Sequence, residues 1–263
     1  MATSRSTNQN ADQILKQPLP PLKTGPHTTQ SSAIHPTIFV GRLGEWNGFE
    51  AEVRRAIDRR RWRNIAIPYT QTGEHVHVGD EHGVQGRFQE RVGEIVSHIA
   101  LQEPPSFAFA DSKCGVPRIS ATPDFIIMKE RGDAIVVGGI KVPWITDHHI
   151  GRVVAEAQSR FGDRELRNVL GQVADYMDVM NLKYGALTTY DETLFLRQTV
   201  VGGRWILELS PVKHFSDTYI NADPQSVTVR QCFWYLGQLA LKGARFNRSG
   251  GSGSQGQIMP WTN

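Results

Sequence analysis

The feature that most constrains the fold is the run at residues 134–142, which reads AIVVGGIKV and is apolar almost throughout. Continuous stretches rich in β-branched side chains are typical of a strand that is covered on both faces. We therefore expect a sheet with helices on either side. Lys141 is the charged residue within this run. Because a buried lysine is unfavourable without a partner, we expect an anionic group beside it.

Apolar periodicity elsewhere in the chain predicts an α/β protein whose elements run helix, three strands, helix and then further strands. We expect helices over residues 49–63, 86–101, 149–161, 164–181 and 223–242. We expect strands over residues 106–110, 118–128, 134–142, 184–190, 193–199 and 205–209. This order predicts a central mixed sheet flanked by helices.

Length and composition are those of an ordinary globular protein with a segment at each end. The 263 residues suffice for one large domain, which we place at residues 36–247 with a helical extension at its N-terminal side. Residues 1–35 are rich in Ser, Thr, Gln, Asn and Pro, and residues 248–263 are rich in Gly and Ser. We expect a disordered N-terminal segment and a flexible C-terminal tail.

Composition also limits the class of protein. Cys114 and Cys232 are the two cysteines of the chain, which excludes a disulfide framework and suits a reducing compartment. No stretch approaches the ~20 apolar residues that span a bilayer, and no secretory signal is evident. We therefore expect an intracellular protein of the cytoplasm or nucleus. The net charge of +3 permits binding to nucleic acid without demanding it.

A candidate site surrounds Lys141. Pro123 and Asp124 precede one predicted strand, and position 139 lies two residues before the lysine on the next. Side chains two apart on a strand point the same way, so position 139 and Lys141 share a face that Asp124 can approach. Carboxylates in such a place can hold Mg²⁺ or Mn²⁺ for phosphodiester hydrolysis, and a lysine can orient the attacking water. Asp124 is the candidate metal ligand, and its alternative role is a turn carboxylate after a proline.

This layout resembles that of the PD-(D/E)XK nuclease superfamily, whose members place Asp or Glu two residues before the lysine. The resemblance implies a restriction-endonuclease-like core of order α-β-β-β-α-β and Mg²⁺-dependent action on DNA, with RNA not excluded. In this chain Gly139 stands where the family has its carboxylate. The resemblance therefore implies the fold more clearly than the activity.

A second motif extends the resemblance. Gln172 and Tyr176 lie one turn apart on a predicted helix, and the RecB-like branch of the superfamily carries such a pair after its lysine strand. The sequence at residues 184–197 is similar to PD-(D/E)XK-like domains common in fungal proteins, and the likeness spans residues 85–242. The family also often uses a glutamate of its first helix, for which Glu90 is preferred over Glu94.

The missing carboxylate leaves three interpretations open. In the first, the protein is a degenerate nuclease that keeps a binding surface. In the second, Gly139 is an inactivating change, natural or engineered, in an active lineage. In the third interpretation the acid has migrated to the following helix, as in some restriction enzymes. Glu156 lies on a predicted helix at the matching distance from Lys141, so it is a candidate metal ligand, or an ordinary exposed helix glutamate.

Arginines near the N-terminal side of the domain are the candidate contacts to nucleic acid, because the guanidinium group binds two phosphate oxygens at once. Trp62 lies among them and could stack on a base. The alternative is an ordinary solvated helix face. The set comprises Arg54, Arg55, Arg59, Arg60, Arg61 and Arg63.

These observations favour a PD-(D/E)XK-like nuclease, weakened or inactive, with Asp124, Lys141, Gln172, Tyr176 and Glu90 at its site. The alternative is a fungal effector or regulator that uses a degenerate nuclease fold to bind nucleic acid or protein. A zinc hydrolase that uses the histidines of residues 74–82 is a further possibility. The sequence does not indicate an oligomeric state.

Overall fold

The structure is a computed structural model that describes residues 7–31, 37–63, 67–69, 74–102, 104–115, 122–159, 162–246 and 258–260. The helical elements are α1 Ala11–Leu15, α2 Phe49–Arg59, α3 Glu81–Phe88, the π-helical η1 Gln89–Gly93, α4 Glu94–Leu101, α5 Ser112–Gly115, the 3₁₀ turn η2 Thr146–His148, α6 Ile150–Ala157, α7 Arg164–Val179 and α8 Val229–Lys242. The strands are β1 Thr7–Gln9, β2 Lys23–Thr24, β3 Thr37–Phe39, β4 Arg42–Glu45, β5 Ile67–Tyr69, β6 His77–Val78, β7 Phe107–Ala110, β8 Phe125–Lys129, β9 Ala134–Ile140, β10 Tyr184–Thr188, β11 Glu192–Val201, β12 Arg204–Leu209, β13 Lys213–His214 and β14 Ile258–Pro260.

An eight-stranded sheet with the order β4-β12-β11-β10-β9-β8-β7 forms the centre of the molecule, and β13 pairs with β11 beside this path. Strand β9 pairs antiparallel with β8 and parallel with β10, and β12 pairs parallel with β4. The predicted α/β architecture with a central mixed sheet flanked by helices is confirmed. Every residue of β9 is buried, as its apolar sequence predicts.

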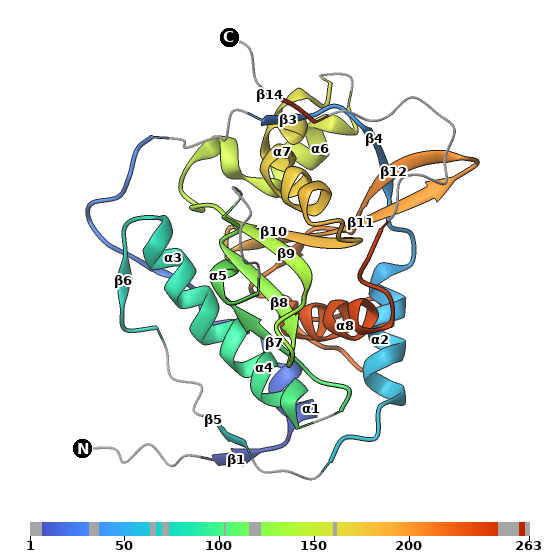
Figure 1. Ribbon diagram of the computed structural model, residues 1–263. Helices are drawn as coiled ribbons and strands as arrows, with labels where there is room; N and C mark the ends of the chain where they lie inside the picture. Colours follow the sequence, from blue (N-terminus) through green and yellow to red (C-terminus); the bar gives the residue numbers. More distant parts are fainter. Residues whose placement is uncertain are drawn as a thin grey trace.

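Helices cover the sheet on both faces (Figure 1). Helix α7 packs on β9 and β10, while α8 contacts β9 from the other side. The two central glycines of β9 show this division: a Cβ at Gly138 would collide with the ring of Phe125, and one at Gly139 would meet Val173 of α7. Gly138 is therefore required by the aromatic core, in which Phe125 lies 6.0 Å from Phe233 of α8 between ring centroids. Gly139 faces α7, where the candidate site lies.

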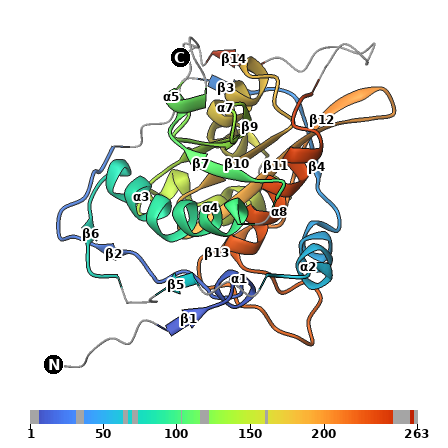
Figure 2. The same ribbon diagram turned by 60° about the horizontal axis from the view of Figure 1, so that its bottom comes forward.

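Disorder was expected over residues 1–35; the structure describes residues 7–31 of this segment, and they include helix α1. Helix α1 buries Ile14 and Leu15 completely, and its N-terminus is closed by a reciprocal capping box between Asn10 and Gln13. The turned view in Figure 2 shows α1 beside β5, with α2 and the last part of the chain before α8 nearby. Tyr190 anchors the segment further along by donating its hydroxyl to the Pro20 carbonyl, 2.7 Å away. A few well-placed apolar side chains outweigh the polar composition of the segment. The tail predicted at 248–263 lies outside the described residues except for β14.

The helix predicted over residues 86–101 begins earlier, at Glu81, because the Asp80 carboxylate caps it by accepting from the Gly83 N–H at 2.8 Å. Its middle is the π-helical turn η1, which is equivalent to one extra residue and changes which side chains after it face the core. Val96 is consequently fully buried, whereas Ile95, which a regular helix would align with Val92 and Ile99, is only partly buried.

Other boundaries also differ from the predictions; helix α2, for example, ends at Arg59 and not at residue 63. Helix α8 begins at Val229 rather than near Asp223, because Thr228 and Gln231 form a capping box, whereas Asp223 accepts from the Gln225 N–H in the preceding turn. Strand β8 begins at Phe125, directly after Asp124. Among the described helices, none has the length and apolar character required to cross a membrane.

Candidate functional site

Asp124 and Lys141 lie at the adjacent ends of β8 and β9. Asp124 precedes β8, and its Oδ2 accepts from the Ile140 N–H at 2.7 Å. Lys141 follows β9, where its backbone N–H donates to the Thr188 carbonyl at 2.9 Å. The lysine side chain is 7% exposed, and its charge acts on the Asp124 carboxyl. The strand pairing thus brings together the two residues that the sequence placed at one site.

Burial raises the pKa of the Asp124 carboxyl from its ordinary value of 3.8 to about 6. The Ile140 N–H and the charge of Lys141 act in the opposite direction, but burial is the larger effect. Since Ile140 already occupies Oδ2, this carboxylate has less capacity to bind a metal than an exposed one.

Position 139 faces Asp124, as strand parity predicts. A Cβ at Gly139 would lie 3.8 Å from Asp124 Oδ2 and 2.7 Å from Val173 Cγ2 on α7. Real Cβ atoms do not approach other heavy atoms to 2.7 Å, so any side chain here would have to displace the valine. The space that a side chain at position 139 would need is therefore occupied by a methyl group of Val173.

Gln172 and Tyr176 meet the same site from α7. The Tyr176 hydroxyl accepts from Gln172 Nε2 at 2.7 Å and donates to the Thr122 carbonyl at 3.2 Å. Burial, with a smaller contribution from the Asp124 charge, raises the pKa of Tyr176. The pair therefore fixes the Thr122–Asp124 turn on α7, and the buried Gln172 Oε1 has no hydrogen-bond partner in the described part of the chain.

A glutamate from the first helix does reach Lys141, but it is Glu81. Its Oε2 lies 3.3 Å from Lys141 Nζ, and Gln85 one turn later donates to the Asp124 carbonyl at 2.6 Å. Glu90 instead pairs with Arg87 at 2.5 Å and lies 3.7 Å from Arg91. The predicted acid thus belongs to an arginine cluster, and the alternative, Glu94, is exposed. The sequence signal for Glu81 was the cap residue Asp80, which marks the true start of the helix.

His148 is a buried residue of the site that the sequence reasoning did not select. Its Nδ1 lies 3.1 Å from the Val142 carbonyl, and because a carbonyl accepts only, Nδ1 carries the proton. Burial lowers the pKa of this imidazole, and the positive charge of Lys141 lowers it further. Its Nε2 is buried and has no hydrogen-bond partner among the described residues.

Glu156, the candidate for a migrated acid, lies on α6 as predicted. Its carboxylate forms an ion pair with Arg152 at 2.8 Å, and Arg152 also pairs with Glu165 at 2.9 Å. Within the described residues its interactions do not include Asp124 or Lys141. The structure therefore places Glu156 in a helix-surface network.

The arginine set is divided by the fold. Arg54 is 8% exposed and donates to the carbonyls of Ile220, Asn221 and Asp223, so it ties α2 to a loop. Arg60 is half-buried, and Trp62 packs against Trp234 with ring centroids 4.9 Å apart. The side chains that are exposed are Arg55, Arg59, Arg61 and Arg63.

The donors present do not fit a Mg²⁺ site. Within the part of the chain that the structure describes, no three His, Cys, Asp or Glu side chains are grouped so that they could hold a metal ion. The Asp124 carboxylate accepts a hydrogen bond from the Ile140 N–H, and the Glu81 carboxylate forms an ion pair with Lys141. Glycine at position 139 has no side-chain oxygen to offer a metal. Nor do the described residues of the histidine-rich segment form such a group, and the Glu74 carboxylate is held by Arg87 and Arg91.

Comparison with known proteins gave no relative: no family model, no curated protein and no solved structure matches this chain.

Proposed function

We propose that this chain is a PD-(D/E)XK-like protein that binds DNA and does not cleave it efficiently in Mg²⁺ or Mn²⁺. The fold part of the proposal is supported by element order. The helix formed by α3, η1 and α4 precedes the antiparallel strands β7, β8 and β9, and α7 leads into β10, which is parallel to β9. With the short helices α5, η2 and α6 left aside, this order agrees with the α-β-β-β-α-β order expected of a restriction-endonuclease-like core, which supports the proposal.

The site supports the same family. Asp124, Lys141 and the α7 pair Gln172 and Tyr176 come from three separate segments of the sequence and converge at the ends of β8 and β9. Gly139 has the strand parity of the family carboxylate. The correspondence therefore covers both the residues and the faces from which they project.

The main observation in favour of lost cleavage is that Val173 packs directly against position 139. The chain lacks the carboxylate, and Val173 fills the space that its first atoms would need. Phosphoryl-transfer chemistry of this type depends on oxygen ligands for the metal, and hard cations bind weakly where few are offered. An inactive site is thus built into the packing as well as into the sequence.

DNA binding is assigned to the exposed arginines of α2 and the segment that follows it. Arg55 and Arg59 are exposed and lie one turn apart on the helix, so both can contact neighbouring phosphates. Arg54, in contrast, is occupied by three backbone carbonyls. We therefore assign the phosphate contacts to the exposed arginines Arg55, Arg59, Arg61 and Arg63.

Cleavage is tested on single- and double-stranded DNA with Mg²⁺ and Mn²⁺. The unaltered protein should give no cleavage. Gly139→Glu combined with Val173→Ala, which supplies the carboxylate and the room for it, should gain cleavage, and adding Lys141→Ala should abolish the gain. Robust cleavage by the unaltered protein would overturn the proposal. If that activity disappeared in Glu156→Gln, the migrated-acid interpretation would replace it.

DNA binding is tested separately by fluorescence anisotropy as a function of salt. Arg55→Glu with Arg59→Glu should weaken binding at least tenfold and reduce the salt dependence, because two phosphate contacts are lost. Arg131→Glu, a charge reversal at an exposed arginine of the β8–β9 turn, is the control and should have a smaller effect. Absence of DNA binding in the folded protein would favour the alternative of a protein-binding module.

A further inference from the structure

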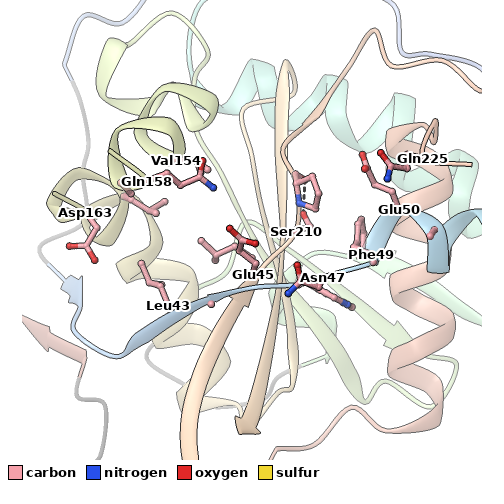
Figure 3. A pocket seen from close by; sticks show the side chains of 18 residues that line it. Leu43, Glu45, Asn47, Phe49, Glu50, Val154, Gln158, Asp163, Ser210 and Gln225 are labelled. Carbon is pink, nitrogen blue, oxygen red and sulfur yellow. Dashed lines mark hydrogen bonds between the residues drawn. The ribbon is translucent and has the colours of Figure 1, made fainter. Parts of the chain in front are cut away.

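A cavity of about 540 Å³ lies at the β4 edge of the sheet, away from the Asp124 site. It is bordered by β4, the start of α2, helix α6, the beginning of α7 and the loop after β12 (Figure 3). None of its lining residues belongs to the Asp124 site. Its volume is within the range of small-molecule sites in proteins. The cavity is therefore large enough for a compact organic ligand.

The walls are largely apolar. Their apolar side chains include Leu43 of β4, Phe49 of α2, Val154 of α6, Leu166 of α7 and Leu209 of β12. Polar side chains such as those of Asn47, Gln158 and Gln225 also line the cavity. A ligand that fills this space must have an apolar body.

The charged groups of the lining are all acidic: Glu45, Glu50 and Asp163, with no lysine, arginine or histidine. Two of them are neutralised from within the chain. Glu50 pairs with Lys213 at 2.7 Å, and Asp163 pairs with Arg167 at 2.7 Å, which lowers the pKa of Asp163. Glu45 has neither an ion pair nor a hydrogen bond to its carboxylate within the described residues. It is thus the charge of the cavity that is left for an external partner.

The position of Glu45 suits it to bind an external partner. Figure 3 shows it in the middle of the cavity, with Val154 of α6 and the next residue after that helix, Gln158, on one side, and Phe49 and Glu50 of α2 on the other. It shares the face of the edge strand β4 with Leu43, two residues before it. A carboxylate beside apolar side chains favours a cation that brings its own hydrogen-bond donors. An anion would meet the repulsion of Glu45 even though the positive end of α2 opens to the same space.

We infer that this cavity binds an organic cation, an ammonium or guanidinium group on an apolar body, with Glu45 as its counter-ion. The ligand is either a small amine or the basic side chain of a peptide, since both present the same chemistry. The inference is independent of DNA binding and of the state of the Asp124 site.

The test uses three probes of one shape and different charge: phenethylamine, 3-phenylpropionate and 2-phenylethanol. Binding to the full chain is followed by isothermal titration calorimetry and by amide chemical shifts. The amine should bind at least tenfold more tightly than the anion and more tightly than the alcohol, with shifts at Glu45, Val154 and Leu166. A short peptide with one lysine between leucines forms a second arm, and stronger binding of the peptide would identify a peptide side chain as the source.

Glu45→Gln keeps the shape of the side chain and removes its charge, so it should weaken amine binding at least tenfold and leave binding of the alcohol unchanged. Glu94→Gln, an exposed glutamate of α4 outside the cavity, is the matched control and should change neither. Equal binding of amine and anion, or amine binding that Glu45→Gln leaves unchanged, would overturn the inference. So would the absence of binding by the amine and by the peptide to protein that remains folded.

Discussion

The Asp124 site and the Glu45 cavity both contain carboxylates, and the chain treats them in opposite ways. At the first site every acid has an internal partner: Asp124 accepts from Ile140, and Glu81 pairs with Lys141. At the second, Glu45 faces open volume without a partner among the described residues. A sequence motif shows where residues meet, whereas open space and an unpaired charge show where a ligand can enter. In this molecule the two indications lie on different parts of the sheet.

The largest effect should come from filling the closed site. Gly139→Ala should destabilise the protein by about 1–3 kcal/mol, because its Cβ would press on Val173. Combining it with Val173→Ala should cost less than the sum of the two single changes, as measured by urea unfolding. Gly86→Ala is the control: a Cβ there meets nothing within 4 Å, so it should stabilise α3 by about 0.4–1 kcal/mol. Strict additivity of the first pair would show that the two positions do not share space.

The next effect concerns pH. In the folded protein the pKa of Asp124 is raised from 3.8 to about 6, so the buried carboxyl favours its protonated form. Its contribution to the stability of the folded state is therefore complete below pH 3.8, the pKa in the unfolded chain, and is lost as the pH rises through about 6. Asp124→Asn removes this loss. The variant should therefore gain stability relative to the unaltered protein between pH 4 and 7.5, on the order of 2 kcal/mol. Parallel pH profiles of unfolding free energy for the two proteins would contradict the buried state of this carboxyl.

A smaller effect is expected at Tyr176. Tyr176→Phe removes the donor to Thr122 and the acceptor for Gln172, which should destabilise the protein by about 1 kcal/mol in thermal or urea unfolding. Tyr219→Phe is the matched control, because its hydroxyl bonds to the exposed Asp58 at 2.9 Å and its loss should matter less. An equal effect of both changes would indicate that the Gln172–Tyr176 pair does not fix the turn before β8.

The smallest effect on stability should come from the open region. Glu45→Gln removes no internal bond that the structure describes, so the free energy of unfolding should change by less than about 0.5 kcal/mol. Differential scanning calorimetry in ligand-free buffer is the measurement. A clear loss of stability would mean that Glu45 already has a structural partner, and it would remove the contrast between the two regions.

Much of the fold was accessible from the sequence because one strong signal fixed its centre. The apolar run that became β9 predicted a doubly covered strand, and strand parity predicted that position 139 faces Asp124; in the structure Gly139 faces both Asp124 and Val173 of α7. Helix α7 and its Gln172–Tyr176 pair lie where the periodicity put them. These features depend on local pattern, which a sequence displays directly.

The rest depended on contacts between distant segments. Glu81 was missed because the helix was expected to begin at residue 86, whereas the Asp80 cap starts it at Glu81. Glu90 was preferred although it forms ion pairs with Arg87 and Arg91. Arg54 has the side chain expected of a phosphate contact, but its guanidinium group donates hydrogen bonds to backbone carbonyls 166 to 169 residues away in the sequence. The cavity beside Glu45 had no sequence signal, since its walls come from five separate elements.

The π-helical turn at Gln89–Gly93 has a consequence for how this protein tolerates change in length. Such a turn is equivalent to one inserted residue, so the segments on either side can be rotated independently of each other. Removing one residue there would restore a regular helix and turn the first segment by about 100° relative to the second. Glu81 and Gln85 would then swing away from β9 although neither had been altered. Deletion of one residue in this turn would thus break the ion pair between Glu81 and Lys141, although the turn lies far from Lys141 in the sequence.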